Sequence, residues 1–197
     1  MIKSPIPKVT NNKQFRAIGI VFGMYKPNDN NLLNKGFIED SSGLNIDAVV
    51  LGKALPLIKK FINFENKYYW IVYPRNKNSD NIHLQIAGIW DPNNFKNNDE
   101  NIKKTHDLLL SLDLKDNLFS IRGKLIFINT QEKDLIIKIC PSRQNKNKKN
   151  KSFKILVKGE ISMKYINSFV SLEVIRKDNT LFMEKFEIIE AKVSEIN

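Results

Sequence analysis

The hydrophobic and polar positions of this 197-residue chain alternate in a way that predicts mostly β-strands. In the first half, runs rich in β-branched and aromatic residues indicate a long strand over 14–27, two short strands over 35–52 and a hairpin over 67–92. Between them, the segment 53–64 has the apolar spacing of a short helix. Strand, strand, strand, helix, strand, strand is the element order of the five-stranded OB barrel.

Two glycines interrupt the long first strand, at Gly19 and Gly23. Glycine inside a strand commonly marks a bulge or a sharp bend. A strand needs such a bend if it is to pair on two sides of a small barrel. The glycines therefore favour a closed barrel over an open sheet.

The second half repeats the strand pattern, with five more strands between 118 and 190. Regular strand spacing with turn signals is typical of a small barrel or sandwich. The intervening segment 96–117 is polar, and its helical face of Ile102, His106, Leu109 and Asp113 is a poor apolar stripe, so we interpret it as a linker containing a possible short helix.

The fold class predicted from these patterns is mainly β with minor α, as two small OB-like five-stranded β-barrels in tandem. The expected organisation is a loose N-terminal arm at 1–13, a first barrel at 14–95, a linker at 96–117, a second barrel at 118–190 with a basic loop at 142–152, and a C-terminal tail at 191–197.

Composition limits the class of protein. The apolar runs are far shorter than the roughly 20 residues of a membrane span, and the N-terminal stretch lacks the apolar centre of a secretory signal. A single cysteine, Cys140, cannot form an internal disulfide and indicates a reducing compartment. We therefore expect a cytoplasmic protein that does not contact a membrane.

The net charge of +11 favours polyanionic partners. An AT-rich genome explains the use of Lys in place of Arg, but it does not explain an excess of bases over acids. Much of the excess lies in the stretch 142–154, SRQNKNKKNKSFK, which has no acidic residue. Its bases are Arg143, Lys146, Lys148, Lys149, Lys151 and Lys154. They are either a nucleic-acid-binding loop, which Lys124 and Lys138 on nearby strands extend, or a solvated hairpin tip.

No catalytic or metal-binding pattern is present in the sequence. His83 and His106 are the only histidines, and one cysteine cannot complete a zinc site of the usual kind. Phosphate-loop, nucleophile-elbow and zinc-protease motifs are missing. We expect no cofactor, no metal and no enzymatic activity.

The hairpin over 67–92 carries a second candidate surface. If Trp70, Val72, Leu84 and Ile86 point inward, the opposite face is an exposed, partly aromatic strip. Aromatic residues of OB barrels stack on nucleobases. The strip consists of Tyr69, Tyr73, Arg75, His83 and Gln85. In the alternative interpretation, the tyrosines pack under the linker or against the second barrel.

Several segments resemble an uncharacterised family of cyanobacterial proteins with two small β-barrel-like halves: GFIEDSSGLNIDAVVLGKALPLIKK, WIVYPRNK, HLQIAGIWDP, FSIRGKLIFI, LIIKI and FKILVKGEI. The resemblance covers most of the chain. It implies a cytoplasmic bacterial setting and brings neither an activity nor catalytic residues.

Two hypotheses follow. The first is a non-enzymatic protein that binds RNA or single-stranded DNA with low sequence specificity through the Lys-rich loop and the aromatic face. The second is an assembly module whose aromatic face binds a protein partner. The oligomeric state is open in both.

Overall fold

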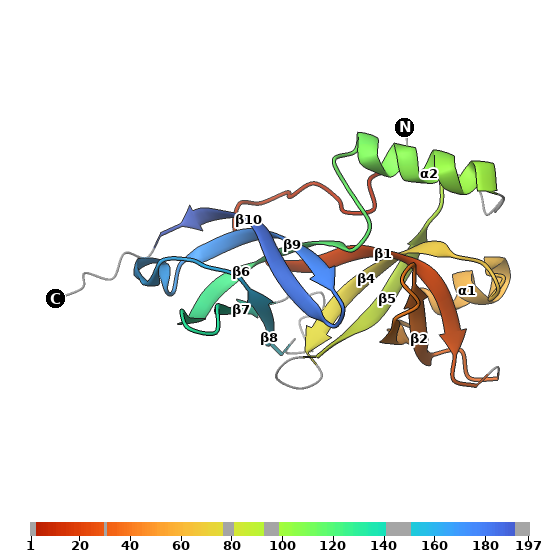
Figure 1. The fold of residues 1–197 in the computed structure, drawn as a ribbon, viewed down its shortest axis with the longest axis horizontal. Coiled ribbons are helices and arrows are strands. Elements are labelled where there is room, and N and C mark those ends of the chain that lie inside the picture. Colours follow the sequence, from red (N-terminus) through yellow and green to blue (C-terminus); the bar gives the residue numbers. More distant parts are fainter. Residues whose placement is uncertain (1–2, 30, 77–80, 93–98, 141–150, 192–197) are drawn as a thin grey trace. The chain divides into compact units, whose positions relative to one another are not determined.

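The computed structural model describes residues 3–29, 31–76, 81–92, 99–140 and 151–191. The chain forms two compact units (Figure 1). Unit 1 comprises 1–8, 19–74 and 82–118, and unit 2 comprises 9–18, 75–81 and 119–197.

Unit 1 is a closed five-stranded barrel. Its strands pair in the order β1-β2-β3-β5-β4, and β1 also pairs with both β2 and β4 to close the ring. The β3–β5 pair is parallel, as an OB barrel requires. The strands are β1 (Arg16–Pro27), β2 (Lys35–Asp40), β3 (Asn45–Val50), β4 (Tyr68–Asn76) and β5 (Ile82–Trp90).

Unit 2 has the same strand order. Its ring is β6-β7-β8-β10-β9, closed by β6–β9, and its parallel pair is β8–β10. The strands are β6 (Leu118–Asn129), β7 (Asp134–Ile139), β8 (Phe153–Lys158), β9 (Phe169–Lys177) and β10 (Thr180–Glu190). Where unit 1 has helix α1 (Leu55–Phe61) between its third and fourth strands, unit 2 has one 3-10 turn, η1 (Met163–Tyr165). The predicted fold class is confirmed.

One glycine in the first strand of each barrel allows a close approach of the second strand. β1 pairs with β4 from Gly19 to Gly23 and with β2 from Gly23 onward, so the strand changes partner at Gly23 as the sequence predicted. A Cβ on Gly23 would lie 2.5 Å from the carbonyl oxygen of Glu39. A Cβ on Gly123 would lie 2.5 Å from that of Lys138. Both barrels therefore exclude a side chain at the same place.

Each unit has its own apolar core. Trp70, Val72, Leu84 and Ile86 are buried in unit 1, which confirms the predicted inward face of the hairpin. The indole N–H of Trp70 donates to the carbonyl oxygen of Gly23 at 2.8 Å, which satisfies its polar atom inside the core. The core of unit 2 includes Phe119, Leu125, Leu135, Ile137, Ile155, Val157, Val170 and Val174.

Helix α2 (Asp99–Ser111) lies within the predicted linker and packs on unit 1. Leu109 is fully buried in a cluster with Tyr69 and Trp90, and Leu108 and Leu112 pack against that cluster. Leu112 follows the end of the helix. The predicted face of Ile102, His106, Leu109 and Asp113 is confirmed at Leu109, which is buried against unit 1, and at His106, whose Nδ1 contacts the Tyr69 hydroxyl. Among the described residues, no helix is long and apolar enough to cross a membrane.

Candidate nucleic-acid interface

Three lysines form a cross-strand row on unit 2. Lys124 on β6 pairs with Lys138 on β7, and Lys138 pairs with Lys154 on β8. Directly paired residues of an antiparallel sheet project from the same face. The sequence neighbours of these lysines, such as Ile137 and Ile155, point to the opposite face of the sheet and are fully buried. The lysine row therefore lies on the outer face of the barrel. The second and third strands of an OB barrel form its usual ligand face.

The lysine row has no ion-pair partner among the residues that the structure describes. Within the described ranges, Lys124, Lys138 and Lys154 form no ion pair. Neighbouring lysines do, because Lys158 contacts Asp134 at 2.6 Å and Lys133 contacts Glu160 at 2.6 Å. Like charges directly opposite in a sheet are destabilising. An anion laid across the row would relieve this repulsion.

Apolar side chains lie next to the lysine row. Phe127 on β6 pairs with Ile136, and Ile136 pairs with Leu156, two residues along the strands from Lys138 and Lys154. Phe127 is 45% exposed, which is unusual for a phenylalanine and leaves its ring available for stacking. Phe182 on β10 is also exposed and pairs with Lys158.

The basic stretch lies only partly within the described residues. Lys151 is exposed just before β8, and Lys154 is exposed on β8 itself. Arg143, Lys146, Lys148 and Lys149 lie outside the described residues. The lysine row therefore rests on Lys124, Lys138 and Lys154 alone.

The predicted aromatic strip does not form as expected at Tyr69. This residue is 4% exposed, because α2 covers it, and its hydroxyl is 2.8 Å from Nδ1 of His106. Burial, together with the carboxylate of Asp116, raises the pKa of the Tyr69 phenol. The alternative interpretation, in which a tyrosine packs under the linker segment, is correct for Tyr69.

The other members of the strip have different surroundings. Tyr73, His83 and Gln85 are half-buried residues of unit 1. Arg75 belongs to unit 2, where its guanidinium lies 3.8 Å from the ring centre of Phe153 at the start of β8. This is a cation–π contact beside Lys154.

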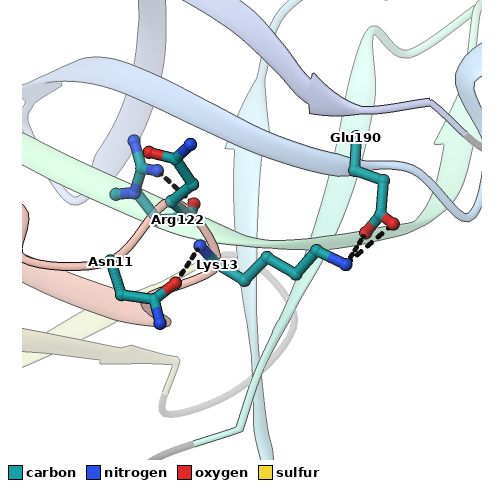
Figure 2. A network of polar contacts seen from close by, with 5 residues as sticks. Asn11, Lys13, Arg122 and Glu190 are labelled. Atoms are coloured by element: carbon teal, nitrogen blue, oxygen red, sulfur yellow. Dashed lines mark hydrogen bonds and ion pairs between the residues drawn. The ribbon is translucent and has the colours of Figure 1, made fainter.

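The N-terminal arm, predicted to be loose, is anchored on unit 2 between Thr10 and Arg16. The buried guanidinium of Arg122 donates to the Asn12 carbonyl oxygen at 2.6 Å and to the hydroxyl of Ser171 at 2.7 Å. Figure 2 shows Lys13 reaching from this arm to the carboxylate of Glu190, at 2.7 Å. Burial lowers the pKa of Arg122, while Glu187 acts in the opposite direction. The anchoring of the arm could not be predicted from the sequence, because Arg122 occupies an outward position of a strand, where solvent is the ordinary neighbour.

Nothing in the described segments suggests catalysis at a metal. No group of three His, Cys, Asp or Glu side chains there is placed to hold a metal ion. The described part of unit 2 has a cationic, partly aromatic outer surface without paired carboxylates at its centre.

Comparison with known families identifies both halves of the chain. Residues 17–97 match the N-terminal OB-fold domain of the PatR RNA-binding protein. Residues 121–190 match a cyanobacterial OB-fold-like RNA-binding domain, C-terminal. The two halves of the chain belong to these two OB-fold domain families. The cyanobacterial two-barrel resemblance seen in the sequence is confirmed, and the PatR family description assigns the chain a nucleic-acid-binding role. No curated protein matches the chain.

Proposed function

We propose that this chain is a non-enzymatic RNA-binding protein whose second barrel carries the RNA along the lysine row, with low sequence specificity. The single observation that carries the proposal is the register of β6, β7 and β8, which sets Lys124, Lys138 and Lys154 side by side without carboxylate partners among the described residues. The RNA-binding description of both matched families supports the choice of ligand.

The physical basis is neutralisation of phosphates. Paired residues on adjacent strands are about 5 Å apart, and neighbouring strands repeat at a similar spacing. This is close to the separation of successive phosphates on an extended single strand, so a strand that crosses β6, β7 and β8 can place one phosphate near each lysine. Each neutralised phosphate of a single strand contributes about 0.7 to the slope of log affinity against log salt.

Low specificity follows from the kind of cation. Lysine is a point charge without the fixed fork of arginine, so it holds a phosphate without reading a base. Stacking on Phe127 adds affinity that every base shares. Lys151 and the basic residues before it extend the same cationic region along the chain.

The test is a salt titration of binding to a fluorescent single-stranded RNA. Replacing Lys124, Lys138 and Lys154 by Gln should reduce the slope by about two units and lower affinity about tenfold to a hundredfold at 0.1 M salt. The matched control replaces three lysines that already have carboxylate partners, Lys26, Lys133 and Lys185.

The control variant loses the same formal charge, so it corrects for net charge. It should change the slope by well under one unit. Equal effects of the two triple variants would contradict the lysine row. A DNA strand of the same sequence, measured in parallel, determines whether the 2′-hydroxyl contributes.

A further inference from the structure

The anchored N-terminal arm builds a cleft on unit 2 that the lysine row does not explain. The cleft has a volume of about 300 Å³, at the lower end of the range for small-molecule sites. We call it the arm cleft. It is lined by Lys13, Phe15, Lys124, Asn167, Phe169 and Glu190.

The arm cleft is preformed. Two turns within the arm stabilise its backbone, with the Lys13 amide donating to Asn11 Oδ1 at 2.8 Å and the Gln14 amide to the Asn11 carbonyl oxygen at 2.9 Å. Arg16 donates to the Ser120 hydroxyl at 2.7 Å, and Arg122 holds the Asn12 carbonyl oxygen. These bonds fix the arm at two points on β6, so Lys13 and Phe15 have defined positions.

One wall of the arm cleft is aromatic. The rings of Phe15 and Phe169 lie 5.0 Å apart in an edge-to-face arrangement. The guanidinium of Arg122 lies 6.0 Å from the centre of the Phe169 ring and supports it. Phe15 is half-buried and Phe169 is buried beneath it, so Phe15 presents the aromatic surface on which a nucleobase can stack.

The other groups that line the cleft are polar. Asn167 has a left-handed backbone (φ 68°), and its amide N–H donates to the Leu125 carbonyl oxygen at 2.7 Å, which fixes the residue at the edge of the cleft. Its side-chain amide can pair with the amino group and ring nitrogen of adenine. The carboxylate of Glu190 accepts hydrogen bonds only, so it also favours a base that carries an amino group.

Lys124 belongs to both surfaces, since it lines the arm cleft and begins the lysine row. A strand whose phosphates follow Lys154, Lys138 and Lys124 therefore reaches the cleft next. The ion pair of Lys13 and Glu190 is exposed on both sides, at 61% and 54%, and such pairs contribute little to stability. Lys13 can therefore exchange its carboxylate partner for a phosphate.

We propose that the arm cleft binds one unstacked nucleotide of the RNA, with a base bearing an amino group and with adenine preferred. The base stacks on Phe15, whose ring is backed by the buried Phe169, Asn167 and Glu190 read its amino edge, and Lys124 and Lys13 hold its phosphates. This inference rests on the proposed function, and it adds one point of base selection to an otherwise non-selective path.

The test compares oligo(A) with oligo(U) of equal length on the full chain, by fluorescence anisotropy at fixed salt. The unaltered protein should bind oligo(A) at least about fivefold more tightly. Asn167→Gly keeps the left-handed backbone without strain, and Glu190→Ala removes the carboxylate. Together they should bring the ratio below about twofold.

Lys138→Gln is the matched control, since it should lower the slope and leave the oligo(A)/oligo(U) ratio intact. Equal binding of both oligonucleotides by the unaltered protein would overturn the inference alone. A ratio that survives in the double variant would do the same. Absence of binding to either RNA would instead overturn the proposed function.

A second measurement locates the base. Ultraviolet crosslinking of oligo(A), followed by peptide mass spectrometry, should yield adducts on peptides that contain Phe15 or Phe169. Adducts confined to other peptides would overturn the inference.

Discussion

The two barrels share one strand order but present different chemistry on the same pair of strands. In unit 1, the outer positions of β2 and β3 pair Lys35 with Val49, Phe37 with Asp47 and Glu39 with Asn45. In unit 2, the outer positions of β7 and β8 pair Lys138 with Lys154, Ile136 with Leu156 and Asp134 with Lys158. The first face has two acids and one base, and the second has an excess of bases.

This difference shows that the barrel fold alone does not determine the ligand. The backbone fixes where a side chain projects, and the residue at each outer position then decides whether a phosphate is attracted. Unit 1 uses part of its outer surface for stability, because α2 covers Tyr69 and Trp90 there. Unit 2 leaves Phe127 and Lys154 exposed, and Lys124 and Lys138 are half-buried. We therefore expect the outer surface of unit 1 to contribute mainly to stability and that of unit 2 mainly to RNA binding.

The largest expected effect tests the role of α2 in unit 1. Leu109 is fully buried, so Leu109→Ala should lower the free energy of unfolding by about 2–5 kcal/mol. Chemical denaturation followed by Trp70 and Trp90 fluorescence measures it. Leu110 is 50% exposed, and Leu110→Ala should cost less than about 0.5 kcal/mol. Equal costs would mean that α2 does not pack as described.

The next prediction concerns what the barrels have in common. Gly23→Ala and Gly123→Ala each push a methyl group against a strand-two carbonyl oxygen, so each should destabilise its own barrel by about 1–3 kcal/mol. Gly52, with no heavy atom near its missing Cβ, is the control, and Gly52→Ala should be close to neutral. Denaturant midpoints measure all three. A neutral Gly123→Ala would break the equivalence of the two barrels.

A smaller effect is expected from making unit 1 resemble unit 2. Asp47→Lys places a base on the outer face of β3, where the side chain is exposed. RNA affinity should rise about twofold to threefold at low salt, and the gain should vanish at high salt. Asp47→Asn separates the loss of the acid from the gain of the base. A gain in affinity from Asp47→Lys that exceeds the loss caused by Lys138→Gln would show that unit 1 already carries the RNA.

The last prediction concerns a change of stability in alkali. Burial raises the pKa of Tyr25 to about 12 and also raises that of Tyr69, from an ordinary value of 10.0. The folded state therefore keeps these protons more tightly, and the stability they contribute is present below pH 10 and is lost as the pH rises further. A variant with Phe at both positions should lose less stability than the unaltered chain between pH 10 and 12. An identical pH profile would contradict this assignment.

Most of the fold could be predicted from the sequence because strands with one buried face alternate visibly. The runs Leu135, Ile137, Ile139 on β7 and Leu84, Ile86 on β5 are examples of this period of two. Helix α2 was harder, because its stripe contains Thr105 and is flanked by exposed Leu110. The apolar face of α2 is too short to distinguish the helix from a polar linker by sequence pattern.

The candidate site was predictable only in part. Lys124, Lys138 and Lys154 could be named from the sequence, but their alignment depends on strand register, which no local pattern fixes. The arm cleft could not be predicted, since its residues come from distant segments that meet through the hydrogen bonds of Arg122 and Arg16 and the Phe15–Phe169 contact. Tyr69 was misplaced because periodicity identifies a face and not what covers it.

The most direct test of the division between the barrels is lysine footprinting, in which acetylation of each lysine is measured by mass spectrometry with and without single-stranded RNA. We predict that RNA protects Lys124, Lys138 and Lys154 and leaves Lys35 and Lys53 of unit 1 reactive. Protection concentrated on Lys35 and Lys53, with the lysine row still reactive, would contradict the account.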